Sequence, residues 1–136
     1  MFADKKKDIA SLSPLTLAFM GDAVFDLLVR EELVSGANRP VKDLHKAASE
    51  RVCASAQSDA IKKIADSLTQ EEADVFRRGR NASPSGHPKN QSVGDYHYAT
   101  GLECLFGWLY LKGDLQRINE LYALISDETE ARNKNE

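Results

Sequence analysis

The stretch LAFMGDAVFDLL (residues 17–28) places Asp22 inside a run of apolar residues whose spacing predicts a buried helix. Ser13 and Pro14 form a favourable helix start, and the predicted helix continues to about Leu33. An isolated ionised carboxylate is costly to bury, so a partner group or a metal ion must compensate its charge. The rest of the chain must therefore supply whatever Asp22 faces.

The 136-residue chain has the composition of one globular domain, with 42% hydrophobic and 29% charged residues. No apolar run reaches the roughly 18 residues of a membrane span, and the N-terminus lacks the apolar segment of a secretory signal. Cys53 and Cys104 lie far apart within helical patterns, which indicates reduced thiols in a cytoplasmic protein. The histidines and cysteines have no paired close spacing, so the sequence does not favour a zinc site.

Apolar residues recur at helical spacing along most of the chain, which predicts an all-α fold with five to seven helices. Residues 41–68 keep this spacing without showing where the helical segment bends or divides. Thr69 and Glu72 then form a capping-box pattern before a short helix. A strongly apolar helix follows over residues 95–112, and Asp114 caps a last amphipathic helix.

These elements are expected to form one domain over residues 13–126. Residues 1–12 form an N-terminal extension, and residues 127–136 form a disordered, frayed tail. Residues 81–94 are rich in Gly, Pro, Ser and Asn, which predicts a flexible loop inside the domain. Loops of this length in a compact domain are usually functional or disordered.

Glu103 is a second acidic residue in the apolar centre of a predicted helix. Gly101 and Gly107 on this helix each allow close approach of another backbone, and in the first helix the small residue Gly21 directly precedes Asp22. If the two helices pack together, Asp22 and Glu103 meet, and two such carboxylates repel unless a proton or a cation lies between them. Oxygen-only ligands suit Mg²⁺. The alternative is that each acid faces solvent or pairs with Arg or Lys.

The segment from residue 76 to residue 94 is locally basic, although the formal net charge of the whole chain is −3. It contains no acid, and its basic side chains, apart from His87, are Arg77, Arg78, Arg80 and Lys89. Duplex RNA is recognised mainly through its backbone and shape, which makes these four residues candidate RNA-binding groups. The alternative is that Arg77 and Arg78 only interact with the C-terminal end of their helix.

Two stretches, LSPLTLAFMGDAVFDLLVREEL (12–33) and YHYATGLECLFGWLYLKGD (96–114), resemble the two hallmark motifs of the ribonuclease III catalytic domain. The likeness covers roughly residues 10–125. FRRGRNA (76–82) and PKN (88–90) lie between the motifs, and no double-stranded-RNA-binding domain is expected. In these respects the chain is similar to Mini-ribonuclease III, the short bacterial branch of the family.

The resemblance implies an all-helical, homodimeric endoribonuclease that cuts double-stranded RNA with Mg²⁺ and leaves 5′-phosphate and 3′-hydroxyl ends. It also implies a role in maturation of large-subunit ribosomal RNA. Asp22 and Glu103 match family acids, and the resemblance implies that they are catalytic and bind the metal. Ala18 and Thr100 replace two further acids of the larger enzymes, and Thr100 is expected to offer a hydroxyl or hold a metal-bound water.

The loss of two family acids leaves other functions open. One alternative is a non-catalytic ribonuclease III-like module that binds structured RNA. Another is a helical protein-interaction module, which would explain the apolar helices but not the basic segment or the paired interior acids. Salt-dependent binding to duplex RNA distinguishes this last alternative from the two RNA functions.

Overall fold

The computed structural model describes residues 8–84 and 92–134, and these residues form an all-helical domain without strands. The elements are η2 (Ile9–Ser11), α1 (Pro14–Gly36), α2 (Val41–Val52), α3 (Ala54–Ile64), η3 (Ala65–Ser67), α4 (Gln70–Ala82), α5 (Val93–Lys112) and α6 (Leu115–Lys134). The six α-helices in the described part of the chain agree with the predicted five to seven, so the all-α prediction is confirmed. In the described ranges, no helix is long and apolar enough to cross a lipid bilayer.

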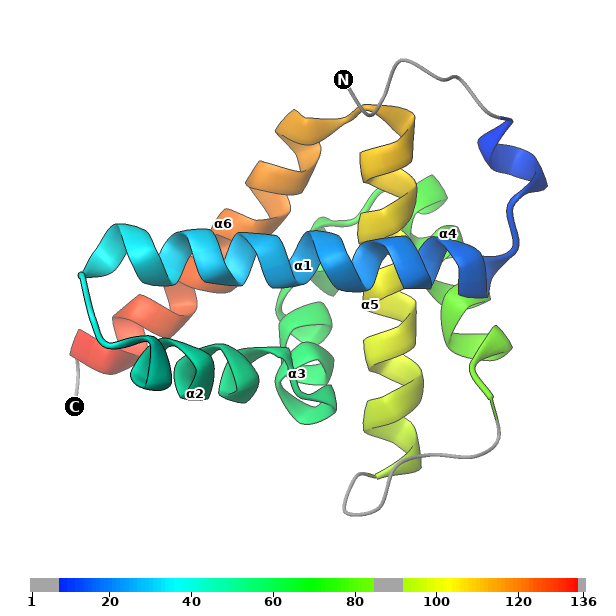
Figure 1. Ribbon diagram of the computed structural model, residues 1–136. Helices are drawn as coiled ribbons and strands as arrows, with labels where there is room; N and C mark the ends of the chain where they lie inside the picture. Colours follow the sequence, from blue (N-terminus) through cyan, green and yellow to red (C-terminus); the bar gives the residue numbers. More distant parts are fainter. Residues whose placement is uncertain (1–7, 85–91, 135–136) are drawn as a thin grey trace.

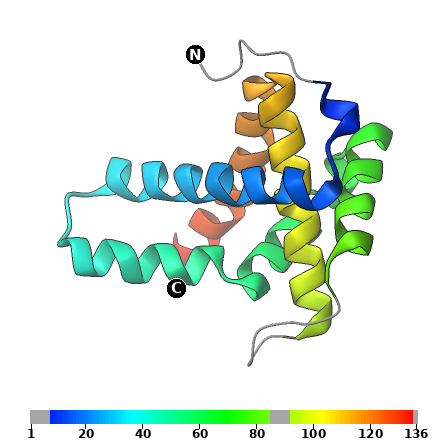
Figure 2. The same cartoon turned by 45° about the vertical axis from the view of Figure 1, so that its right-hand side comes forward.

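Helix α5 is the centre of the molecule. Helix α1 crosses its middle, and α3 and α4 lie along its two sides (Figure 1). The view in Figure 2 shows α4 alongside α5, on the side away from α2. The core is built around fully buried apolar side chains of α5, namely Leu102, Leu105, Phe106 and Leu109. This arrangement explains the strongly apolar sequence of α5, because neighbouring helices cover it on several faces.

Several helix ends lie where local sequence signals predict them. The Ser13 hydroxyl accepts a hydrogen bond from the backbone N–H of Thr16 (3.2 Å) at the start of α1. Thr69 and Glu72 form the reciprocal capping box of α4. Gly113 ends α5 with a φ of 86°, a left-handed conformation that glycine adopts without steric cost.

Glu72 also fixes α4 to the last helix. The residue is only 4% exposed, and its carboxylate accepts hydrogen bonds from Nε and Nη2 of Arg117 at 2.8 and 2.9 Å. Arg117 Nη2 also donates to the carbonyl of Ser67 at 2.7 Å. These two hydrogen bonds from one guanidinium compensate the Glu72 carboxylate for the water contacts that it loses on burial. Glu72 is therefore a buried acid with a structural partner.

The structure differs from the predictions at three boundaries. The long helical region divides at Cys53, whose ψ of 160° is extended, although neither glycine nor proline marks the position. Helix α5 begins at Val93 rather than residue 95, because the Ser92 hydroxyl caps the N–H of Asp95. Helix α6 continues to Lys134, through most of the segment predicted as a frayed tail, and Glu, Ala, Arg and Lys favour helix.

Part of the predicted extension and loop lies outside the described residues. This applies to residues 1–7 and 85–91, and therefore to Lys89 and His87. Within the described part of the chain, both Cys53 and Cys104 are free thiols, as the sequence predicted.

Candidate active site

Helices α1 and α5 meet backbone to backbone at two glycines. A Cβ atom added to Gly21 would lie 1.6 Å from the carbonyl oxygen of Glu103. A Cβ atom added to Gly107 would lie 1.9 Å from the carbonyl oxygen of Leu17. No side-chain layer separates the helices here, so Asp22, which follows Gly21, is brought beside Glu103. The predicted meeting of the two acids is therefore present in the fold.

The Asp22 and Glu103 carboxyl groups interact directly. Burial, a hydrogen bond to Asp22 and the charge of Asp22, in that order of importance, together raise the pKa of Glu103 to about 8. The Gln57 side chain also hydrogen-bonds Glu103 and acts in the opposite direction. At neutral pH without a cation, Glu103 therefore stays protonated, and its carboxyl O–H donates a hydrogen bond to Asp22. A cation between the two groups would replace that proton.

The predicted burial of Asp22 is wrong, because its side chain is exposed. Helix α1 packs on α5 through the face that contains Gly21 and the buried Ala18 and Phe25. Its other side is uncovered, and Phe19, from the same apolar run, is 83% exposed. The apolar residues of α1 thus divide between the face packed on α5 and the uncovered face on the opposite side. Asp22 opens the site to solvent, whereas Glu103 lies deeper.

Thr100 and Ala18, which stand where larger family members carry acids, are both buried. The Thr100 hydroxyl donates to the carbonyl of Tyr96 at 3.0 Å and lies 3.2 Å from the Ser83 hydroxyl. These contacts use the Thr100 hydroxyl proton within the protein, and the proposed role of Thr100 toward a metal or a metal-bound water stays a prediction. Among the residues that the structure describes, no group of three or more His, Cys, Asp or Glu side chains could hold a metal ion.

Gln57 is a site residue that sequence reasoning missed. It lies on α3 with only 2% of its surface exposed, and it hydrogen-bonds Glu103. Its position relative to the buried Ala54 and Ile61 follows helical spacing, so the sequence contained a signal for a buried amide. A buried amide needs a polar partner, and Glu103 provides one.

The three described arginines of the basic segment do not share one surface. Gly79 faces α5, where an added Cβ would lie 2.4 Å from Cβ of Cys104. Arg78 and Arg80 therefore point to opposite sides, each about 100° around α4 from Gly79. Arg77 forms an ion pair with Asp74 at 3.0 Å. The basic segment predicted as one cluster is divided by the packing of α4.

Comparison with known proteins agrees with this geometry. The sequence profile of the Ribonuclease III domain matches residues 15–114. A Mini-ribonuclease 3 of Thermoanaerobacter sp. (strain X514) is 46% identical over 119 residues, which cover 88% of this chain and 84% of the relative. The chain belongs to the Mini-ribonuclease 3 family.

One further Mini-ribonuclease 3 and one solved structure support this assignment. The Mini-ribonuclease 3 of Symbiobacterium thermophilum is 42% identical over 117 residues, covering 86% of this chain and 90% of the relative. The crystal structure of a protein from Fusobacterium nucleatum superposes with a TM-score of 0.80 and 31% identity, covering 88% of this chain and 91% of that one. The predicted family and fold are therefore confirmed.

Glu103→Gln is expected to stabilise the metal-free protein above pH 8 and to change its stability little near about pH 5. The pKa of Glu103 is about 8 in the folded protein, against 4.5 for an unperturbed glutamate. Between these values the folded state binds the additional proton, so wild-type stability falls as the pH rises through this range. Neutral glutamine has no such loss. Thermal unfolding in chelator measures the effect.

The exposed Glu31, also on α1, supplies a matched control as Glu31→Gln. This variant should retain the pH dependence of the wild type. If Glu103→Gln also retained it, the raised pKa of Glu103 would be contradicted.

Proposed function

We propose that the protein is an Mg²⁺-dependent endoribonuclease that cleaves double-stranded RNA and leaves 5′-phosphate and 3′-hydroxyl ends. Its proposed substrate is a precursor of large-subunit ribosomal RNA. The observation that carries this proposal is the pairing of Asp22 with Glu103 at the glycine crossing of α1 and α5. Membership of the Mini-ribonuclease 3 family supports it.

The two carboxyl groups fit a hard divalent cation. Mg²⁺ prefers oxygen ligands and is commonly held by one or two carboxylates, with waters and substrate phosphate as the remaining ligands. Asp22 and Glu103 would be its protein ligands. When bound there, Mg²⁺ supplies charge neutralisation at the scissile phosphate and activation of water for hydrolysis.

The protein groups around the pair have separate tasks. Glu103 must release its proton before it can act as an ionised ligand. The buried Gln57 amide holds the Glu103 carboxyl group in position through its hydrogen bond. Asp22 lies at the exposed side of the pair, so an RNA strand can approach from solvent without unfolding the helices.

Basic residues outside this pair are proposed to contact RNA phosphates. Arg78 is exposed and forms no ion pair with another described residue, so its guanidinium is available. Arg77 would have to exchange Asp74 for a phosphate. Arg80 and Lys89 complete the proposed set, and Lys89 lies outside the described residues.

A homodimer is proposed to form through the uncovered side of α1. Phe19 lies about 160° around the helix from Gly21, so it points away from α5. Its side chain is 83% exposed, and Leu15 and Leu27 on the same side are 41% and 63% exposed. Two copies meeting there would bury a continuous apolar stripe and present two Asp22–Glu103 pairs, one for each strand of a duplex.

Phe19→Glu is expected to shift the protein from dimer to monomer and to weaken association by at least about a hundredfold. In a twofold interface the substitution removes two buried aromatic side chains, each worth about 1.5–3 kcal/mol, and brings two charges together. Sedimentation equilibrium measures the dissociation constant. Leu115→Glu is the matched control, because Leu115 is 55% exposed at the start of α6. An unchanged dimer in Phe19→Glu would exclude this interface.

The proposed activity is tested by incubating the purified protein with a long RNA duplex, with Mg²⁺ or with chelator. Cleavage is expected only with Mg²⁺, and the products should carry 5′-phosphates that a kinase cannot label before dephosphorylation. Salt-sensitive binding to the duplex without cleavage would instead identify a non-catalytic RNA-binding module. Absence of both binding and cleavage would contradict either RNA function.

A further inference from the structure

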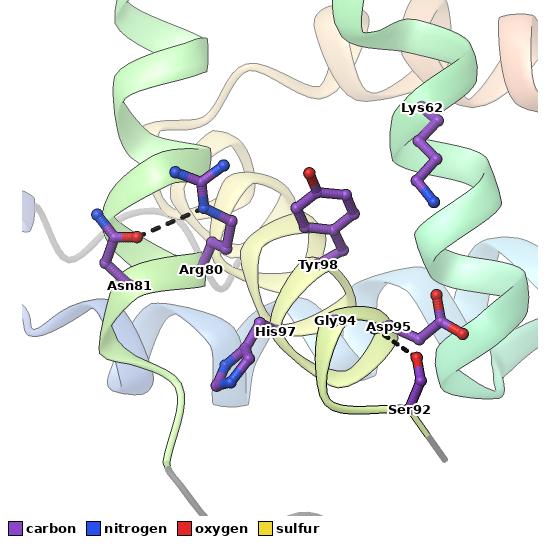
Figure 3. Close-up of a pocket in the computed structure, with 8 residues that line it drawn as sticks. All are labelled: Lys62, Arg80, Asn81, Ser92, Gly94, Asp95, His97 and Tyr98. Carbon is purple, nitrogen blue, oxygen red and sulfur yellow. Dashed lines mark hydrogen bonds between the residues drawn. The ribbon is translucent and has the colours of Figure 1, made fainter.

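An open pocket of about 620 Å³ lies where the beginning of α5 meets α3 and the end of α4. Figure 3 shows the Tyr98 ring of α5 between Lys62 of α3 and Arg80 of α4. Asp95 and His97 line the same pocket. Its volume is within the range of small-ligand and cofactor sites and exceeds what a single phosphate requires.

The two cations are held against the aromatic ring rather than by carboxylates. Lys62 Nζ lies 5.3 Å from the centre of the Tyr98 ring, and Arg80 Cζ lies 5.9 Å from it. Arg80 also lies 5.8 Å from the centre of the Phe76 ring. Within residues 8–84 and 92–134, neither Lys62 nor Arg80 forms an ion pair. These contacts position two positive charges on opposite walls of one pocket.

The pocket has hydrogen-bonding capacity that the described protein groups leave unused. Arg80 donates through Nε to Asn81 Oδ1 at 3.4 Å, which leaves its terminal N–H groups for another acceptor. Nδ1 of His97 is buried and has no hydrogen-bond partner in the part of the chain that the structure describes. Among the described residues that line the pocket, Asp95 is the one carboxylate, against two cations. The charge balance and the free donors therefore favour an anion.

We propose that this pocket, defined by Lys62, Arg80 and Tyr98, binds a phosphate group carried on a nucleotide. Arg80 donates to the phosphate oxygens, Lys62 adds a second positive charge to the same pocket from the other side of the Tyr98 ring, and the remaining volume accommodates the attached sugar. Guanidinium and ammonium groups are the usual protein partners of phosphate. The phosphate belongs either to an RNA strand or to a free nucleotide, and the experiment below distinguishes these sources.

The position of the pocket favours an RNA strand, and this part of the inference rests on the proposed function. Tyr98 precedes Glu103 by five residues, which is roughly 7.5 Å along the α5 axis and about 140° around it. The pocket is thus close to the Asp22–Glu103 pair but opens on a different side of α5. An RNA bound at the cleavage centre would gain an additional contact to its backbone there.

The test compares Lys62→Gln and Arg80→Gln with wild type for binding to an RNA duplex in chelator, where no cleavage occurs. Each substitution is expected to lower affinity about tenfold, as for the loss of one charge-assisted hydrogen bond. The slope of log affinity against log salt should fall by about 0.9. Circular dichroism checks that the variants fold.

Lys112→Gln is the matched control, because Lys112 Nζ lies 4.4 Å from the centre of the Trp108 ring near the other end of α5. It removes the same kind of lysine–aromatic contact outside the pocket and should leave duplex affinity unchanged. Adenosine 5′-monophosphate is titrated in parallel, with the amide NMR signals of Gly94 and Tyr98 as the readout.

Weaker duplex binding in both pocket variants but not in the control supports an RNA phosphate in the pocket. Nucleotide-induced shifts that Lys62→Gln abolishes, with duplex binding unchanged, support the pocket with a free nucleotide as ligand. Wild-type duplex affinity in both pocket variants together with no nucleotide shifts overturns the proposal. Because binding is measured without cleavage, failure of the pocket proposal leaves the nuclease proposal intact. Conversely, a protein that binds nucleotide in the pocket but never cleaves RNA contradicts only the nuclease proposal.

Discussion

Asp22→Asn and Glu103→Gln are each expected to lower the rate of duplex RNA cleavage by at least about a thousandfold. Each substitution keeps the shape of the side chain and removes one of the two negative charges proposed to hold Mg²⁺. Loss of preorganised charge stabilisation at a reacting phosphate has effects of this size. Single-turnover cleavage of an RNA duplex with saturating enzyme measures the chemical step separately from binding.

The same two variants distinguish loss of chemistry from loss of structure. Both should bind duplex RNA in chelator about as well as wild type, because the basic residues are unchanged. Glu103→Gln should also be the more stable protein above pH 8, so unfolding could not explain its inactivity. Glu31→Gln, which removes an exposed charge from α1, should cleave normally. Substantial cleavage by Asp22→Asn or Glu103→Gln would exclude the pair as the catalytic centre.

Gly21→Ala and Gly107→Ala are each expected to cost more than about 4 kcal/mol of folding free energy, or to prevent folding. The added methyl groups would lie 1.6 and 1.9 Å from backbone carbonyl oxygens. A side chain could rotate away from such an overlap, but a helix backbone cannot. The helices would have to separate, which exposes core residues and parts Asp22 from Glu103. Urea unfolding followed by circular dichroism measures the loss.

Gly36→Ala is the matched control for these substitutions. Gly36 is the last residue of α1, and no atom lies within 4 Å of a Cβ added there. Alanine should leave stability unchanged or increase it by up to about 1 kcal/mol, because it restricts the unfolded chain. A Gly21→Ala protein as stable as Gly36→Ala would show that α1 and α5 do not meet backbone to backbone.

The parts of the fold that the sequence predicts are those set by neighbouring residues. Ser13, the Thr69–Glu72 capping box and Gly113 act within one helical turn, and each lies at a helix end in the structure. The break at Cys53 has no such local signal, because Cys53 makes no side-chain cap to α3. Packing of separate α2 and α3 segments around the core determines it, and single-residue propensities do not contain that information.

The candidate site was predictable to a similar extent. Two interior acids, each near a glycine, indicated that Asp22 and Glu103 meet, because glycine marks where backbones approach. The exposure of Asp22 was not predictable, since the apolar residues of α1 divide between the core and an uncovered surface. Lys62 gave no signal either, because its pocket exists only where three helices come together.

The glycine crossing also determines when the proposed Asp22–Glu103 centre can form during synthesis of the chain. Asp22 leaves the ribosome early, whereas Glu103 is added only after most of the chain has been made. Because these carboxylates are joined by contact of distant helices, an incomplete chain contains no assembled centre. With the proposed centre, cleavage would begin only when α5 docks against α1, so it would report that this long-range contact has formed.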